Sequence, residues 1–174
     1  MKYLVKIFVV TFLLLINTQA SAEQKVAYLD MKFVLNNSKA GKGAQDFLQK
    51  SFKENQKKFL DRENALKKEE SGLLTQKTIL TKGEYQKKSD NLRKKVIDYQ
   101  SQRRTSLEQI TTQRAEARQK LLEKLDPIMK TYIKENDISL IIDRKNVLMG
   151  NTNLDITSII VEKLNKEFPS LIIK

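Results

Sequence analysis

The chain has 174 residues, a formal net charge of +12 and a calculated isoelectric point of about 9.7, and it contains neither cysteine nor histidine. Without these two residue types there is no disulfide framework, and the usual metal ligands and nucleophile-base pairs are missing. Adjacent carboxylates such as Glu69 and Glu70 point to different faces of a helix and do not form an acid-base pair. We therefore expect a protein that is not an enzyme and that uses no cofactor and no metal.

Residues 1–22 have the pattern of a secretory signal peptide. Lys2 and Lys6 flank the start, an apolar run follows over residues 7–16, and Ala20-Ser21-Ala22 is a small-residue cleavage pattern. The alternative is an uncleaved anchor, but the apolar run is shorter than the roughly 18 residues that a membrane-spanning helix needs. We therefore expect cleavage after Ala22 and export of the chain that begins at Glu23.

Residues 39–136 hold the entire net charge of the exported chain. They contain 24 Lys+Arg and 14 Asp+Glu, a balance of 24 minus 14, or +10, whereas residues 23–38 and 137–174 carry 7 basic and 7 acidic groups. The segment has only four Gly and one Pro, which favours a long helix. Burying it would desolvate unpaired charge at nearly every turn, so it must stand in water.

The first strand is expected over residues 25–30, because its residues have the β-type composition of a short strand. Asp30 can cap a brief helical turn, and Asn36-Asn37-Ser38 breaks that turn and caps the helix that follows. A long helix then runs from about residue 39 to 77, with an apolar residue at every seventh position. Its predicted seam is Phe52, Phe59, Leu66 and Leu73, supplemented by Phe47, Leu48, Leu60 and Leu74.

The chain is expected to reverse over residues 78–83, where Thr81 and Glu84 fit a capping box. The second helix is predicted over residues 84–125, so the two helices form an antiparallel hairpin about 60 Å long. Its predicted stripe is Tyr85, Leu92, Val96, Tyr99, Leu107, Ile110, Ala117, Leu121 and Leu125. Pro127 should kink or restart the helix, and a last helical piece should cover residues 128–136.

Residues 137–143 and 146–149 are predicted to form a β-hairpin through a tight turn at Arg144-Lys145. Asp155 can then cap a closing helix whose apolar face is Ile156, Ile159, Ile160, Leu164 and Phe168. The first strand must pair with this hairpin across the whole inserted helical segment. Three short strands leave two unpaired edges, and such edges invite pairing with another copy of the chain.

Four stretches of sequence form a recognisable pattern around the basic helices. They are Lys25-Val-Ala-Tyr-Leu-Asp-Met-Lys-Phe-Val-Leu35, Leu125-Asp-Pro-Ile128, Asn136-Asp-Ile-Ser-Leu-Ile-Ile-Asp143 and Asp155-Ile-Thr157. In this order the chain resembles the Skp/OmpH family of periplasmic chaperones over essentially its whole exported length. The resemblance implies a homotrimer in which strands of three chains close a small β-barrel, and a cavity between the helical arms that holds unfolded outer-membrane β-barrel proteins. The main departure is an extended C-terminal tail over residues 168–174.

The expected fold class is α+β, with a small β body of three short strands per chain, completed by trimerisation, and a long protruding antiparallel α-helical coiled-coil hairpin. The domains are then a signal peptide (1–22), a β-rich trimerisation body (23–38 and 137–174) and a client-holding helical arm (39–136). The candidate oligomerisation residues are Val26, Tyr28, Leu140, Ile141, Ile142 and Val147.

A basic arm would attract an unfolded client of net negative charge over about one Debye length, roughly 8 Å at physiological salt. We expect many weak contacts, no requirement for ATP and a periplasmic location, as the resemblance implies. The candidate client-binding residues are Lys57, Lys58, Arg62, Lys67, Lys68, Lys87, Lys88, Arg93, Lys94, Lys95, Arg103 and Arg104.

Two other interpretations stay open at this stage. The basic residues can be a solvated coiled-coil surface that binds nothing, or the chain can bind anionic polymers or membrane surfaces, such as nucleic acid or lipopolysaccharide, through counterion release. The export signal and the lack of a base-reading motif argue against a specific nucleic-acid partner. Transient contact with anionic membrane lipid or lipopolysaccharide is compatible with either function, and no basic position can be assigned to it uniquely.

Overall fold

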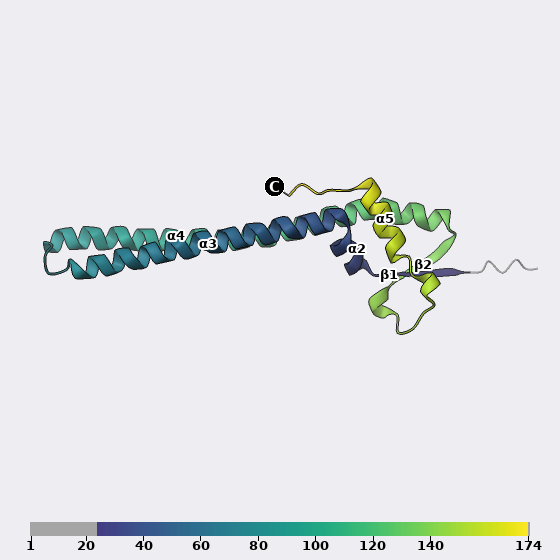
Figure 1. The fold of residues 1–174 in the computed structure, drawn as a ribbon, viewed down its shortest axis with the longest axis horizontal. Helices are drawn as coiled ribbons and strands as arrows, with labels where there is room; N and C mark the ends of the chain where they lie inside the picture. The colour runs from purple at the N-terminus through teal and green to yellow at the C-terminus, as the bar shows by residue number, and fades with distance from the viewer. Residues whose placement is uncertain (1–23, 174) are drawn as a thin grey trace, which may run out of the picture.

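The computed structural model describes residues 24–173 and consists of a long two-helix arm with a small body at one end (Figure 1). The expected signal peptide lies outside the described residues. In chain order the elements are β1 (Lys25–Leu29), α2 (Met31–Asn37), α3 (Lys39–Thr75), α4 (Lys82–Glu135), β2 (Ile138–Asp143), the 3₁₀ helices η1 (Arg144–Asn146) and η2 (Thr152–Leu154), and α5 (Thr157–Glu167). The predicted α+β class with a protruding helical hairpin is confirmed. Over residues 24–173, none of the helices combines the length and the apolar character needed to cross a lipid bilayer.

Side-chain caps start α2, α3 and α4 where the sequence predicts them, but the predicted cap of α5 at Asp155 is wrong, because Ile156 holds the N-cap position without a side-chain cap hydrogen bond. Asp30 Oδ1 accepts a hydrogen bond from the amide of Phe33 (2.8 Å), and the hydroxyl of the fully buried Ser38 accepts one from Gly41 (3.1 Å). Thr81 and Glu84 form the predicted capping box at the arm tip. The carboxylate of Glu84 accepts hydrogen bonds from both the hydroxyl and the amide of Thr81, and these bonds lower its pKa.

The expected restart of the helix at Pro127 is wrong, because α4 continues through it to Glu135. Pro127 has no amide hydrogen, so the carbonyl one turn earlier, at Glu123, loses its helical partner. Glu123 is exposed, and water can satisfy that carbonyl. Leu125 and Ile128, on either side of the proline, are only 1% and 3% exposed in the core of the body, and this burial favours a continuous helix.

The sheet has two parallel strands in the described chain, with Ala27 opposite Ile141 and Tyr28 opposite Ile142. The expected third strand over residues 146–149 is absent from this part of the chain. Instead, Asp143 accepts a hydrogen bond from the amide of Lys145 (3.1 Å), and the chain turns into η1. The next residues form a loop whose Gly150 lies against the Tyr28 ring, where an added Cβ would be 3.1 Å from a ring carbon.

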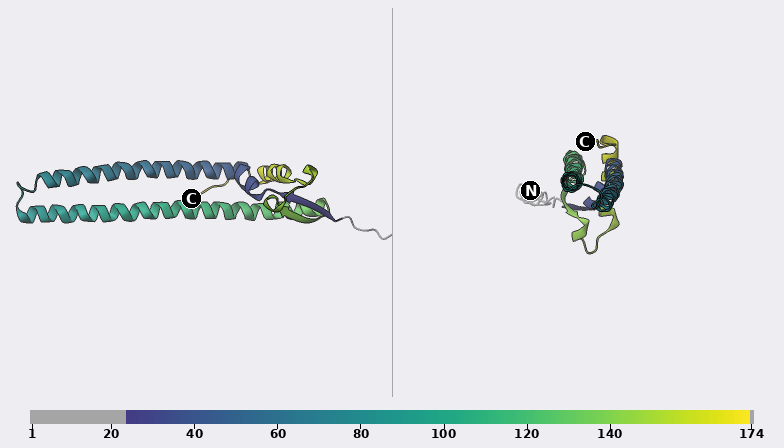
Figure 2. Two further views of the ribbon diagram at one scale, coloured as in Figure 1. Left: turned by 90° about the horizontal axis from the view of Figure 1, so that it is seen from below. Right: turned by 90° about the vertical axis from the view of Figure 1, so that its left-hand side faces the viewer.

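The core of the body joins both ends of the chain. Leu29 of β1, Val34 of α2, Leu125 of α4, and Ile160 and Leu164 of α5 are each at most 1% exposed and belong to one cluster. Ala40, at the start of α3, is also fully buried in it. Figure 2 shows α5 lying just beyond the start of α3 and beside the last part of α4. The body therefore fixes the position of the arm.

The arm seam is thinner than predicted. Leu48, Phe59 and Leu73 of α3 are buried, but the predicted seam residue Phe52 is 43% exposed, and Leu107, predicted to face it from α4, is 48% exposed. Phe47, Leu60 and Leu74, the supplementary residues, are exposed as well. A straight helix drifts by about 20° per heptad, so a sevenfold spacing of apolar residues does not keep all of them at the partner helix. The buried line on α3 passes instead through the half-buried Ser51 and Asn55.

Gly41 allows the close approach of α2 and α3. A Cβ built at Gly41 would lie 1.8 Å from the carbonyl oxygen of Leu35, whereas one at Gly43 would meet nothing within 4 Å. We expect Gly41→Ala to lower the free energy of unfolding by about 2 kcal/mol or more, because the clash is with backbone. Gly43→Ala should raise it by about 0.5–1 kcal/mol through helix propensity. Urea unfolding at one fixed protein concentration measures both, and equal effects of the two variants would contradict the close packing at Gly41.

Candidate functional site

Most basic side chains of the arm have no carboxylate partner in the part of the chain that the structure describes. Of the 24 Lys+Arg in residues 39–136, seven form an ion pair, which leaves 24 minus 7, or 17. The seven paired residues are Lys50, Arg62, Lys67, Arg93, Lys95, Arg104 and Lys130. Within residues 24–173, none of the other basic groups of the arm forms an ion pair.

The twelve predicted client-binding residues fall into two groups. Within the described chain, six have no ion pair and no hydrogen-bond partner, and all six are exposed: Lys57, Lys58, Lys68, Lys87, Lys94 and Arg103. The others have partners. Arg93 and Arg104 pair loosely within α4, at 3.8 and 3.9 Å, and Lys88 donates a hydrogen bond to Gln76 across the hairpin (2.8 Å).

Arg62 and Lys95 take part in polar contacts that hold α3 and α4 together. The Arg62 guanidinium lies 2.6 Å from both Asp98 Oδ2 and Gln102 Oε1 of α4. Lys95 Nζ of α4 lies 2.7 Å from Glu69 Oε1 of α3. Arg62, which is only half exposed, is therefore part of the seam and is the least available of the twelve.

Glu63 and Tyr99 link the same region of the seam. The Tyr99 hydroxyl donates a hydrogen bond to Glu63 Oε2 (3.1 Å), and Lys67 lies 2.7 Å from Glu63 Oε1. The hydrogen bond from Lys67, followed by that from Tyr99, lowers the pKa of Glu63. Burial, followed by the hydrogen bond to Glu63, raises the pKa of Tyr99. Glu63 is thus engaged by Lys67 and Tyr99, and the positive charge of Arg103 also contributes to its lowered pKa.

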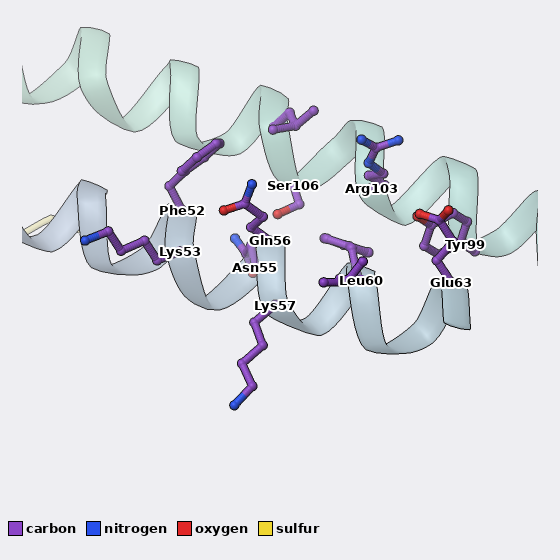
Figure 3. A pocket seen from close by; sticks show the side chains of 12 residues that line it. Phe52, Lys53, Asn55, Gln56, Lys57, Leu60, Glu63, Tyr99, Arg103 and Ser106 are labelled. Atoms are coloured by element: carbon purple, nitrogen blue, oxygen red, sulfur yellow. The ribbon is translucent and has the colours of Figure 1, made fainter. Parts of the chain in front are cut away.

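An open groove of about 460 Å³ lies next to this region, between α3 and α4 (Figure 3). Phe52, Phe59, Leu60 and Leu107 give it apolar walls. Asn55 and Ser106 also line it, and these short polar side chains leave the space between the helices unfilled. Figure 3 shows Phe52 reaching towards α4 and Lys57 pointing away from it.

Unpaired cations surround this groove. Lys53, Lys57 and Arg103 line it, and none of them has an ion pair among the described residues. The one carboxylate in the lining is Glu63, which Lys67 and Tyr99 engage. The groove therefore combines an apolar interior with a positive rim.

A second groove of about 610 Å³ lies nearer the base of the arm. Leu35, Leu48 and Phe52 line it together with Arg114 and Arg118 of α4, and Phe52 belongs to both grooves. Neither arginine is among the client-binding residues predicted from the sequence. Their spacing of four residues, which places both on one face of a helix, was the available signal. The candidate surface of the arm is thus a strip of apolar grooves with unpaired lysines and arginines along it.

The candidate oligomerisation residues lie on both faces of the sheet. Val26 and Leu140, opposite one another in register, are 36% and 54% exposed. Because side chains alternate along a strand, Tyr28 and Ile142 share their face, which we call the outer face. Ile141 points the other way and packs against the core of its own chain, and Val147 lies near Tyr28 in the loop around Gly150.

The free edge of β2 lies beside this outer face. One side of β1 pairs with β2, and on its other side the carbonyl of Tyr28 accepts a hydrogen bond from the amide of Ile156 (3.0 Å). β2 has a single strand neighbour within the described chain. Leu148 and Met149, in the loop after η1, are 101% and 94% exposed. This end of the body therefore presents both unpaired strand backbone and apolar side chains.

Comparisons with known proteins place the whole described architecture in one family. The family model described as "Outer membrane protein (OmpH-like)" matches residues 25–164. A "Skp-like protein" of Pseudomonas aeruginosa is 24% identical over 166 residues, which cover 95% of this chain and 99% of that protein. A crystal structure of an OmpH-like protein from Caulobacter crescentus CB15 superposes with a TM-score of 0.81 at 18% identity, and covers 91% of this chain and 94% of that one. The fold, the matched residues and the two relatives agree, and the chain belongs to the Skp/OmpH family of outer membrane chaperones.

Proposed function

We propose that the protein is an ATP-independent holdase of the periplasm that binds unfolded outer-membrane β-barrel proteins after export and keeps them soluble for delivery to the outer membrane. The observation that carries this proposal is the strip of apolar grooves with unpaired cations along the arm. An unfolded barrel chain offers alternating apolar side chains and aromatic residues, which the grooves accept. Net negative charge on such a chain would be attracted by the unpaired lysines and arginines.

The combination of apolar and basic surface favours a holdase over a pure polyanion binder. Binding of nucleic acid or another anionic polymer needs phosphate contacts from lysine and arginine, and exposed Phe52, Leu60 and Leu107 contribute nothing to such contacts. A holdase needs both long-range electrostatic attraction and apolar contacts. Long-range charge speeds capture, and apolar contacts hold the client once it has arrived.

We further propose that the working form is a homotrimer assembled through the body. The free edge of β2 and the exposed Val26, Leu140, Leu148 and Met149 support this proposal. Pairing of strand edges between copies removes unpaired backbone groups from water and closes the sheet. The arms of three copies would then project from one shared body, and the signal peptide over residues 1–22 would bring the chain to the periplasm.

The unpaired lysines should control the rate of capture. Changing Lys57, Lys58, Lys68, Lys87 and Lys94 to Gln should slow capture of an unfolded outer-membrane barrel about tenfold at low salt, because long-range attraction is lost. High salt should slow the native protein and leave the variant nearly unchanged. The measurement is the rate at which aggregation of the barrel is suppressed, at low and high salt.

The matched control changes the same five lysines to Arg, which keeps the charge and should keep both the rate and its salt response. If the Gln variant captured the client as fast as the native protein and with the same salt response, the basic arm would be only a solvated surface.

A charge on the outer face should prevent assembly. Leu140→Asp would place a carboxylate at the proposed contact between copies, and we expect it to convert trimers to monomers. Analytical sedimentation at micromolar protein concentration measures this change. Ile79→Asp is the matched control, because Ile79 is 81% exposed at the arm tip, far from the body (Figure 1). A trimeric Leu140→Asp protein, or loss of the trimer in Ile79→Asp, would refute assembly through the outer face.

A further inference from the structure

The C-terminal tail, residues 168–173, follows α5 and runs back along the arm towards its tip (Figures 1 and 2). It lies beyond residue 164, where the match to the family model ends. Its five residues after Phe168 span roughly 17 Å when extended, which corresponds to about three turns of a helix. The tail is therefore long enough to cover a substantial part of the arm base.

Apolar side chains attach the tail. Phe168 and Leu171 are half-buried and pack against the core cluster of the body, and Lys124 Nζ of α4 lies 5.8 Å from the centroid of the Phe168 ring. Ile173 is half-buried, whereas Ile172 is 78% exposed. One side of the segment therefore faces the protein and the other faces water.

The backbone of the tail contributes no hydrogen bond to this attachment. Within residues 24–173, the last backbone hydrogen bond of the chain is that from the amide of Phe168 to the carbonyl of Leu164 (2.8 Å), which closes α5. Residues 169–173 belong to no helix or strand. Within residues 24–173, side-chain contacts hold this segment, so these residues can leave the surface without breaking a ladder of hydrogen bonds.

We propose that the strip of the arm base covered by the tail is a binding site for extended apolar segments of an unfolded polypeptide, and that the tail is its resident occupant. This inference rests on the proposed function. It adds the place where one client segment binds and names the tail as the segment that the client must displace. A site that binds apolar side chains and forms no hydrogen bond with the backbone of the ligand accepts many sequences, and it accepts a peptide in either chain direction. That tolerance suits a chaperone with varied clients.

A tethered occupant competes strongly with free ligand. A short tether gives an effective concentration in the millimolar range, so a peptide that binds the bare site should bind the intact protein at least tenfold more weakly. A long client offers several segments and can displace the tail while other contacts hold it. The tail would thereby prevent short apolar peptides from occupying the site.

The test uses the exported protein, a truncated form lacking residues 168–174, and a fluorescent peptide with the sequence of those seven residues. Fluorescence anisotropy should show at least tenfold tighter binding of the peptide by the truncated form. Leu171→Ser in the full-length protein should also increase peptide binding, because it loosens the tail. Ile172→Ser is the matched control and should bind like the unaltered protein, since that side chain points to water.

Equal peptide binding by the truncated and intact forms would overturn the inference. Thermal unfolding shows whether the truncated form is folded. If it is not, the full-length Leu171→Ser protein tests the inference instead. A folded Leu171→Ser protein with no gain in peptide binding shows that the tail is only a part of the core.

A second readout separates this inference from the proposed function. An unfolded outer-membrane barrel should displace the peptide from the truncated form. Suppose that the barrel fails to displace the peptide while the same protein suppresses aggregation of that barrel. In that case the ligand assigned to the site under the tail is wrong and the holdase function stands. If the peptide binds as expected but no barrel is protected from aggregation, the holdase function fails and the peptide site stands.

Discussion

The packing of both chain ends into one small core is the constraint on which the rest of the structure depends. The arm is inserted between β1 and β2, so the parallel pairing of these strands closes a connection of more than 100 residues. Parallel strands need a crossover, and here the crossover consists of α2, α3 and α4. Burial of Leu29, Val34, Leu125, Ile160 and Leu164 in a common cluster holds its two ends together.

The arm itself is held by a sparse seam, and this sparseness creates its proposed binding surface. Buried residues such as Phe59 and Tyr99, whose rings meet edge to face at 6.0 Å, alternate with polar links such as Arg62 to Asp98. Exposed ion pairs contribute little, about 0–1 kcal/mol each. A fuller seam would bury Phe52 and Leu107 and leave no apolar groove. The same sparse packing that makes the arm less stable therefore provides its proposed binding surface.

The body and the arm divide the proposed work. The free edge of β2 and the outer face of the sheet lie at the end from which the arm projects, so assembly there leaves the grooves accessible. The tail connects the two parts, because it begins at α5 and ends on the arm. Exchange of the tail for a client segment would replace one set of weak side-chain contacts by another, and such an exchange needs no external energy source.

The sequence alone determined the elements whose signals are local. The capping residues Asp30, Ser38 and Thr81 set the helix starts, and the charge imbalance of residues 39–136 required a solvent-exposed arm. Only the tertiary structure decided which side chains pair and which face each residue takes. Pro127 stays within a helix because the body buries its neighbours, and Arg62 joins the seam because Asp98 and Gln102 face it from α4. Periodicity fixes a stripe only to within the drift of a helix over several heptads, whereas these outcomes depend on contacts between residues distant in the chain.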